Sequence, residues 1–426
     1  MEFRRGIELW VGAGPCDLSQ IRGGFGAEAS GCSTMSPNPL VDGDRDGVSR
    51  RDFLRVGSMS VVALTAAEQA RRRAMAQQKV GARRCLLVVA NGGPCQLDTF
   101  DPKPHATLDV RGPFRPIQTA VSGTFISELL PNLARRAEKY LLVRSMHHTA
   151  APIHEASQQL LETGRLRSKG LTPPSLGSLV ARHIDPEGAA PLYAVLPEPV
   201  KWPMSMALAP HGAGSLGEAF EPWTPASAAV DEKELVAQWL AKEDATFWRL
   251  YGRPGPSGDL EFGRQCLLAR VLLEHDFRFV TVQMFPHLEG QLSWDCHASE
   301  TSSPTTVSET ARVAPAFDRA ISGLLDDLDE RGLLQETLVV VAGEFGRTPR
   351  INRHGGRDHW ANAWSILMAG GGLPGGTILG ATTENGGEPA DCPVTPTDLA
   401  TTILTHFGCG SDSTELAAGV AIGDRL

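Results

Sequence analysis

The chain has 426 residues, of which 42% are hydrophobic and 21% are charged, and its formal net charge is −9. These values exclude a disordered, collagenous or coiled-coil chain and supply enough apolar side chains for a sizeable core. The chain lacks both a run of 18 apolar residues and a basic block in its body, so we expect neither a standard membrane-spanning helix nor a nucleic-acid partner. The 8 cysteines form no CxxC pair, which argues against a disulfide scaffold or a structural zinc ribbon.

Residues 49–76 have the pattern of an export signal. The sequence SRRDFL resembles a twin-arginine signal, with Arg50 and Arg51 as the paired arginines. A mildly apolar stretch, three arginines and an A-x-A cleavage motif ending at Ala76 follow in the expected order. We therefore expect the twin-arginine machinery to export the folded protein to the periplasm or the extracellular space. The alternative is a short amphipathic helix that begins at Ser49.

Residues 1–48 fit no part of this signal. They are glycine-rich and show no hydrophobic period, so they are either a disordered extension or the result of a start assigned upstream of Met35. Downstream of the signal we find neither a repeat nor a convincing linker. Residues 77–426 are therefore expected to form a single, acidic domain.

Six short apolar runs predict the strands of that domain. Several runs are continuous rather than alternating, which is typical of strands buried on both faces of a sheet. The runs are Cys85–Ala90, Tyr140–Val143, Leu192–Leu196, Phe277–Met284, Thr337–Ala342 and Trp364–Ala369.

Helical patterns alternate with these strands. They cover Leu129–Lys139, His154–Thr163, Leu176–His183, Glu232–Tyr251, Leu260–Asp276, Val313–Gly332 and Thr397–Phe407. The alternation predicts an α/β fold with a mainly parallel central sheet and helices on both faces. In such sheets ligands bind at the carboxyl ends of the strands, so polar clusters that follow the apolar runs are candidate sites.

Two such clusters follow the first two strands. Asn91 begins a glycine-rich turn that leads to Asp98, a hard oxygen donor. The second strand leads to three histidines within eight residues. His147 and His148 are more simply read as ordinary core or surface residues, whereas His154 opens a helix, where the helix dipole and free N–H groups favour a site.

Three further clusters follow the later strands. Asp295 and His297 lie two residues apart on a loop, where both side chains can reach one divalent ion. Glu344 leaves the end of a buried strand, and its alternative role is an ion pair with Arg347. A glycine-rich loop then brings together Arg357, Asp358 and His359. Together the clusters predict a metal-dependent site for an oxyanion.

The chain resembles a bacterial family of exported proteins known as domain of unknown function 1501, within the alkaline phosphatase/sulfatase superfamily. The resemblance runs from Ser49 to the end of the chain. Its motifs are SRRDFL, the stretch 92–104, WDCH at 294–297, GEFGRTP at 343–349 and GRDHW at 356–360. It implies an alkaline phosphatase-like three-layer sandwich and a divalent metal ion (zinc, calcium or manganese).

Several positions depart from the superfamily pattern. Asn91 stands where an aspartate binds one metal, with Asp98 as the nearest substitute, and Phe345 stands where a histidine follows the acid. His154 takes the place of the Ser, Thr or Cys nucleophile, by count from the end of its helix. The resemblance therefore implies one metal ion rather than two.

The surviving ligand set implied by the resemblance is Asp295, His297 and His359, and Asp358 is a further candidate.

Two classes of function remain open. In the first, the protein is a hydrolase of phosphate or sulfate esters that uses activated water, with His154 or Glu344 as general base and Arg347 or Arg357 as the anion clamp. Its partners would be anionic esters or sulfated or phosphorylated glycans. In the second, the protein is a non-catalytic envelope protein that binds an anionic glycan or a partner protein.

The export signal yields a direct test. Substitution of Arg50→Lys together with Arg51→Lys should retain the protein in the cytoplasm, because the paired arginines are the recognised element of the signal. Cell fractionation measures the result, and the matched change Arg71→Lys with Arg72→Lys should leave export intact. Normal appearance of the mature double variant outside the membrane would show that residues 49–76 are no twin-arginine signal.

Overall fold

The computed structural model describes residues 83–200, 211–252, 259–288, 292–298, 306–409 and 419–426. The predicted segments 1–48 and 49–76 lie outside these residues, so both remain predictions. None of the helices in the described ranges is long and apolar enough to cross a membrane.

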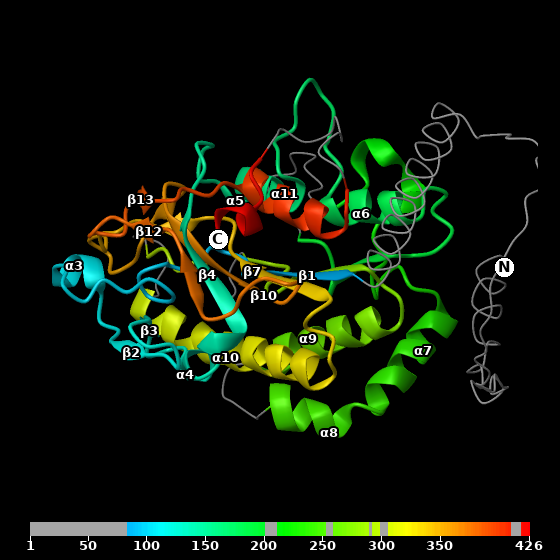
Figure 1. Ribbon diagram of the computed structural model, residues 1–426, viewed down its shortest axis with the longest axis horizontal. Coiled ribbons are helices and arrows are strands. Elements are labelled where there is room, and N and C mark those ends of the chain that lie inside the picture. The colour runs from blue at the N-terminus through cyan, green and yellow to red at the C-terminus, as the bar shows by residue number, and fades with distance from the viewer. Residues whose placement is uncertain (1–82, 201–210, 253–258, 289–291, 299–305, 410–418) are drawn as a thin grey trace, which may run out of the picture. The chain divides into compact units, whose positions relative to one another are not determined.

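A seven-stranded sheet forms the middle of the fold, in the order β11-β4-β10-β7-β1-β6-β5 (Figure 1). Neighbouring strands are parallel except that β10 is antiparallel to both β4 and β7. All six predicted strands are confirmed, and the short edge strand β11 is an addition. The strands are β1 (Arg84–Val89), β4 (Tyr140–Met146), β5 (Tyr193–Leu196), β6 (Phe279–Gln283), β7 (Thr337–Ala342), β10 (Trp364–Ala369) and β11 (Thr377–Leu379).

Both faces of the sheet are buried, as the continuous apolar runs predicted. On β1, Leu86 and Val88 belong to one hydrophobic cluster, and Cys85 and Leu87 belong to the other. Because successive side chains of a strand point to opposite faces, an apolar run lets one strand serve two cores. The predicted α/β class, with a mainly parallel sheet between two layers of helices, is confirmed.

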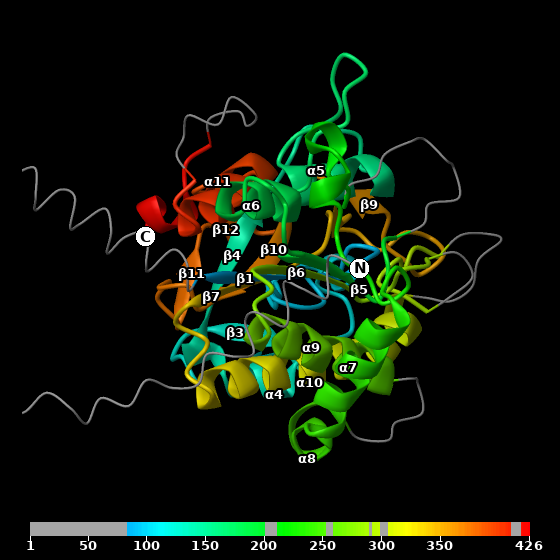
Figure 2. The same cartoon turned by 90° about the vertical axis from the view of Figure 1, so that its right-hand side faces the viewer.

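The helices divide between the two faces. In both views α5, α6 and α11 lie on one side of the sheet and α4, α9 and α10 on the other (Figures 1 and 2). The helices are α3 (Leu108–Arg111), α4 (Pro131–Ala134), α5 (His154–Thr163), α6 (Leu176–Ile184), α7 (Val230–Ala241), α8 (Asp244–Thr246), α9 (Asp259–Glu274), α10 (Thr306–Glu330) and α11 (Pro396–His406). Two-stranded ladders pair β2 (Pro116–Gln118) with β3 (Phe125–Ser127), β8 (Gly346–Arg347) with β9 (His359–Trp360), and β12 (Ala381–Thr382) with β13 (Pro389–Asp391).

Two predicted helices are interrupted in the structure. The pattern over 129–139 yields only α4 and a 3₁₀ turn at Ala137–Lys139, and the pattern over 232–251 divides into α7, α8 and a π-helical turn at Phe247–Tyr251. By contrast, α10 begins well before the predicted Val313 and carries Pro315 inside it. Hydrophobic period alone therefore located these helices but not their ends.

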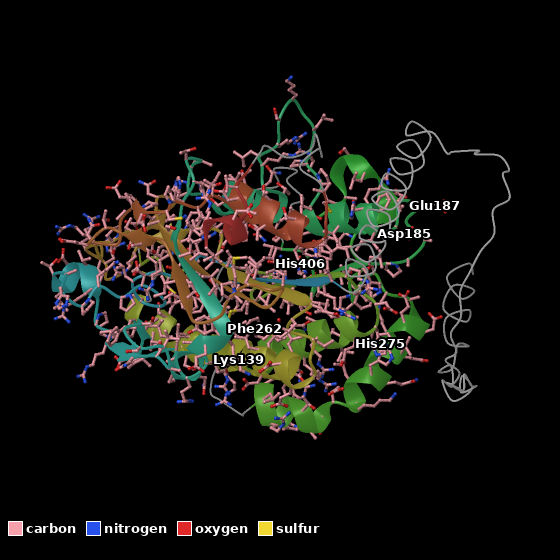
Figure 3. The ribbon with its side chains drawn as sticks, viewed as in Figure 1. Lys139, Asp185, Glu187, Phe262, His275 and His406 are labelled. Atoms are coloured by element: carbon pink, nitrogen blue, oxygen red, sulfur yellow. The ribbon has the colours of Figure 1, made fainter. Side chains whose placement is uncertain are left out.

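Polar contacts fix the ends of several helices. His406 at the end of α11 donates from Nε2 to the carbonyl oxygen of Arg84 at 3.0 Å, which ties α11 to the start of β1 (Figure 3). Lys139 lies 3.0 Å from a carboxylate oxygen of Asp326 on α10. The ring of His275 after α9 stacks on Trp239 of α7, with ring centroids 3.6 Å apart. These contacts hold the helical layers in register with the sheet.

The candidate residues lie at one edge of the sheet. The carboxyl ends of β1 and β7 lead directly to Asn91 and Glu344, and β6 leads through a loop to Asp295. Because β10 runs the opposite way, its amino end lies at the same edge, and His359 precedes it there. Because β10 is antiparallel to its neighbours, His359, which precedes β10, lies at the same edge as Asn91 and Glu344, which follow strands.

A core substitution tests the packing of α10. Leu324 is fully buried on the face of this helix that packs into the core. Leu324→Ala should lower the free energy of unfolding by about 2–5 kcal/mol, through lost burial and the cavity left behind. Arg312→Ala, at an exposed position of the same helix, should change it by less than about 0.5 kcal/mol. Denaturant unfolding measures both values, and equal effects would contradict this assignment of the buried face.

Candidate metal centre

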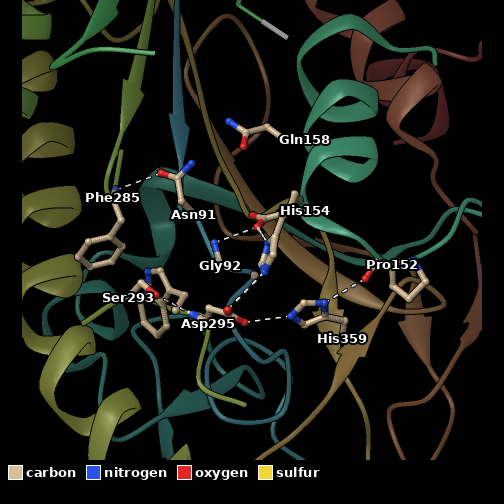
Figure 4. Close-up of polar contacts among 12 residues, drawn as sticks. Asn91, Gly92, Pro152, His154, Gln158, Phe285, Ser293, Asp295 and His359 are labelled. Atoms are coloured by element: carbon tan, nitrogen blue, oxygen red, sulfur yellow. Dashed lines mark hydrogen bonds and ion pairs between the residues drawn. The ribbon is translucent and has the colours of Figure 1, made fainter. Parts of the chain in front are cut away.

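The carboxylate of Asp295 is the centre of a dense polar cluster (Figure 4). Its Oδ1 lies 2.8 Å from Nδ1 of His297, 3.0 Å from Nε2 of His359 and 2.8 Å from Nη2 of Arg347. Its Oδ2 lies 3.4 Å from Nε2 of His154. The sequence motifs around 295, 345 and 358 therefore meet at one carboxylate, together with the first residue of α5.

His154 is held between two carboxylates. Its Nδ1 lies 2.7 Å from Oε1 of Glu344, and the same oxygen accepts the backbone N–H of Gly92 at 2.9 Å. The side chain of Glu344 is fully buried. Since a carboxylate oxygen accepts hydrogen bonds, this contact places a proton on Nδ1 of His154 and directs Nε2 toward Asp295.

The tautomer of His359 is fixed by a backbone contact. Its Nδ1 donates to the carbonyl oxygen of Pro152 at 3.0 Å, so Nε2 carries a lone pair when the ring is neutral. That lone pair faces Oδ1 of Asp295 at 3.0 Å, which brings two acceptors together. Burial lowers the pKa of His359 more than Asp295 raises it, so the ring stays neutral near pH 7. Such a contact is favourable only with a cation close to both atoms.

Protonation of His154 supplies one such cation. Burial lowers the pKa of His154, but its contacts with Asp295 and Glu344 outweigh this and raise the pKa to about 9. For Asp295, burial opposes ionisation, yet the three imidazoles and Arg347 hold its pKa far below the usual range. In metal-free protein at neutral pH, the cluster therefore contains an imidazolium between two carboxylates.

A divalent metal ion fits the same position. One ligand atom from each of His154, Asp295 and His359 lies within 4.8 Å of the other two. Two imidazole nitrogens and one carboxylate oxygen are a donor set for zinc or manganese, whereas calcium prefers oxygen alone. Three protein ligands also leave a coordination position open, as in catalytic zinc sites. Glu344 and the carbonyl of Pro152 would orient the two imidazoles from behind.

The other predicted residues near this centre have different places. His297 contacts Asp295 from the solvent side, and its side chain is 42% exposed. Arg347 is buried and directed inward, where its guanidinium donates to Asp295 and to the backbone oxygens of Gly92, Gly93 and Trp294. Because the guanidinium donates to these protein oxygens, it holds Asp295 in place and does not form the predicted anion clamp.

Asp98, Arg357 and Asp358 do not join the cluster. Nε of Arg357 donates to Oδ2 of Asp98 at 3.0 Å, and neither side chain is exposed. The remaining donors of Arg357 go to the carbonyl oxygens of Val110, Thr348 and Pro349. Asp358 is exposed and accepts from Nδ2 of Asn352 at 3.1 Å. Asp98 and Arg357 neutralise each other, and Asp358 faces solvent. This geometry argues against Asp98 and Asp358 as metal ligands and against Arg357 as an anion clamp.

A buried polar network that no motif predicted lies beside the cluster. Asn91 donates to Oε1 of Gln283 at 2.6 Å, and Gln283 donates to Oε1 of Glu162 at 3.0 Å. Gln158 also donates to Glu162 at 2.8 Å, and His211 lies 2.5 Å from its other oxygen. All five side chains are buried. The sequence pattern that could have indicated this network is in α5, where the polar residues 154, 158 and 162 share one helical face.

Close approach of the backbone explains the glycines after β1. An added Cβ at Gly92, where φ is +103°, would lie 2.3 Å from the backbone nitrogen of Asp295. At Gly93 it would lie 2.7 Å from the ring of Phe345. That ring in turn packs against His154 and His359, with centroids 5.0 and 4.5 Å away. The aromatic residue that replaces the expected histidine thus packs against the imidazoles of His154 and His359.

The chain belongs to the family described as Protein of unknown function (DUF1501), whose profile matches residues 82–238 and 227–422. The resemblance derived from the motifs is thereby confirmed. No curated protein matches the chain.

Solved structures with a similar fold include three distant proteins. The phosphonate monoester hydrolase of Silicibacter pomeroyi is 13% identical, with a TM-score of 0.44 over 80% of this chain and 76% of that one. A sulfatase from Pseudoalteromonas sp. is 15% identical, with 0.39 over 82% and 73%. An alkaline phosphatase superfamily protein from Vibrio parahaemolyticus is 12% identical, with 0.40 over 76% and 66%. Because each TM-score lies below 0.5, we take no function from these proteins.

The position of His154 predicts how the stability of the metal-free protein depends on pH. The folded-state pKa of about 9 lies above the ordinary value of 6.5, so this group stabilises the fold fully below pH 6.5 and loses its effect as the pH rises through 9. Urea unfolding in the presence of a chelator should show a loss of about 3 kcal/mol over this range.

Two variants isolate this effect. His154→Gln removes the titrating group and should abolish the pH dependence between 6.5 and 9. His183→Gln, at an exposed position on α6, should leave it in place. An unchanged slope in His154→Gln would mean that the imidazole is not held between the two carboxylates.

Proposed function

We propose that the protein is a metal-dependent hydrolase of phosphate or sulfate esters that uses one divalent ion. The observation that carries this proposal is the convergence of one ligand atom each from His154, Asp295 and His359, all within 4.8 Å of one another. His154 completes a three-ligand set with an open side. When bound, the ion would lower the pKa of a water ligand to about 7 and polarise an ester oxygen.

The residues of this chain divide the remaining work. His154, Asp295 and His359 would hold the ion, and Glu344 orients His154 from a fully buried position. Glu344 therefore cannot reach a substrate, which argues against its predicted role as general base. His297 is the more exposed imidazole of the cluster and would accept the proton of the attacking water.

No hydroxyl or thiol occupies the start of α5, where the superfamily nucleophile is expected. The first residue there is His154, whose two ring nitrogens face Glu344 and Asp295. An imidazole committed on both sides cannot attack an ester. We therefore infer direct attack by water in a single displacement.

The substrates that suit this centre are anionic esters, including sulfated or phosphorylated glycans. The support is chemical, since a divalent ion with an open position attracts an oxyanion. If the twin-arginine signal acts as predicted, such substrates would be met in the periplasm or outside the cell. Folding before export would also let the ion bind in the cytoplasm.

Elemental analysis of the purified protein tests the metal site. We expect about one zinc or manganese per chain, and Asp295→Asn should lower that content at least about tenfold, because it removes a ligand that also faces Arg347. Asp358→Asn makes the same change at an exposed neighbour of His359 and should retain the metal. Equal metal contents in the two variants would contradict the proposed ligand set.

The stereochemical outcome tests the mechanism. Hydrolysis of a chiral phosphate ester in isotopically labelled water should invert the configuration at phosphorus, as one displacement requires. Retention, or a trapped covalent phospho-enzyme, would contradict direct water attack. Bound metal without turnover of any ester would instead favour the alternative of a non-catalytic protein that binds an anionic glycan or a partner protein.

A further inference from the structure

The connection between α5 and α6 stands out from the described surface. In both views this segment rises above the layer of α5, α6 and α11, away from the sheet (Figures 1 and 2). Its tip has the sequence Arg-Leu-Arg-Ser-Lys-Gly-Leu over residues 165–171, which we call the basic tip. Every residue of the basic tip after Arg165 is exposed. The segment therefore presents its side chains to the surroundings and not to the core.

Local contacts fix the shape of the basic tip. Ser168 and Leu171 form an antiparallel bridge, and the N–H of Leu171 donates to the carbonyl oxygen of Ser168 at 3.0 Å. Between them Lys169 and Gly170 have φ values of +51° and +79°, as in a type I′ turn. The basic tip is therefore largely preformed, and little conformational entropy would be lost on binding a partner.

The start of the basic tip is anchored to the helix before it. Gly164 ends α5 in the left-handed conformation, with φ of +72°. The backbone N–H of Arg167 then donates to Oε1 of the buried Gln159 at 2.8 Å. On the other side of the turn, Pro173 and Pro174 are buried. The basic tip thus projects from two fixed points.

The composition of the basic tip is unusual for an exposed turn. Arg165, Arg167 and Lys169 place three positive charges on it, in a chain whose net charge is −9. Among the residues that the structure describes, none of the three forms an ion pair. Two leucines accompany the cations, Leu166 with 40% and Leu171 with 68% of its surface exposed.

We propose that the basic tip docks on an anionic lipid bilayer. The cations would approach lipid headgroups, and the two leucines would enter the boundary between headgroups and acyl chains. The combination favours a membrane over a soluble polyanion, because a polyanion provides no apolar layer for exposed leucines. The proposal is independent of the metal centre.

Co-sedimentation of the full chain with vesicles tests this proposal. We expect binding to vesicles of phosphatidylcholine mixed with phosphatidylglycerol, and much weaker binding to phosphatidylcholine alone. Arg167→Gln with Lys169→Gln should lower the partition coefficient about 25-fold, at about fivefold for each cation near an anionic surface. The matched control is Lys233→Gln with Lys242→Gln, two exposed cations at α7, which should bind as the wild type does.

A second pair of variants separates a membrane from other anions. Leu171→Ser should weaken vesicle binding several-fold, whereas Val230→Ser, at a 74% exposed position on α7, should not. Residues 1–82 are the same in all variants, so they contribute equally to each measurement. In Leu171→Trp, indole emission should shift to shorter wavelength on addition of the anionic vesicles.

Three results would overturn the proposal. The first is equal vesicle binding by the basic-tip and α7 double variants. The second is a loss of binding with the cation substitutions but not with Leu171→Ser, accompanied by equal affinity for heparin, which would indicate a site for a soluble polyanion. The third is an unshifted emission of Leu171→Trp on vesicles that bind the protein, because the tip would then lie outside the contact.

Discussion

The carboxylate of Asp295 receives contacts from four side chains of three separate segments, and the geometry of the whole site follows from it. His154 comes from the start of α5, His297 from the same loop as Asp295, and Arg347 and His359 from the paired strands β8 and β9. Only 16% of the carboxylate side chain is exposed. A buried charge of this kind costs several kcal/mol unless its partners are fixed in place. The backbone oxygens that receive Arg347 and the Glu344 carboxylate behind His154 perform that task.

A second constraint is the tight approach of backbone segments at this edge of the sheet. The backbone N–H of Gly92 donates to Glu344, and Gly92 also lies close to the backbone of Asp295. This single glycine therefore sets the distance between the two acidic residues. Asn91 beside it joins the buried network that reaches Glu162 through Gln283. These hydrogen bonds link the ends of β1 and β6 to α5 and so fix the strand ends relative to that helix. The candidate metal centre therefore depends on backbone and amide contacts as much as on its proposed ligands.

The limits of sequence analysis are clearest in residues that look alike in the sequence. Continuous apolar runs predicted six strands correctly, but Thr377–Leu379 is too short and too closely flanked by glycine to carry such a signal. Asp295 and His359 are predicted from polar clusters in the loops after strands and from the family resemblance. Asp98 and Arg357 had the same local pattern, yet they pair with each other. Which charges pair depends on burial and on contacts across more than 250 residues of sequence, which a motif does not contain.

The reversed direction of β10 has a consequence for the order in which the site can assemble during synthesis. His359 precedes β10, which pairs with β4 and β7, so the cluster is complete only when the chain through the end of β10 at residue 369 has joined the sheet. A nascent chain that lacks its last quarter cannot present the three-ligand set. If the centre binds a metal ion as proposed, the ion is selected only once β10 has joined the sheet, in the compartment where the sheet is completed. If the twin-arginine signal acts as predicted, that compartment is the cytoplasm, and the metal supply there, rather than that at the destination, would decide which ion the centre carries.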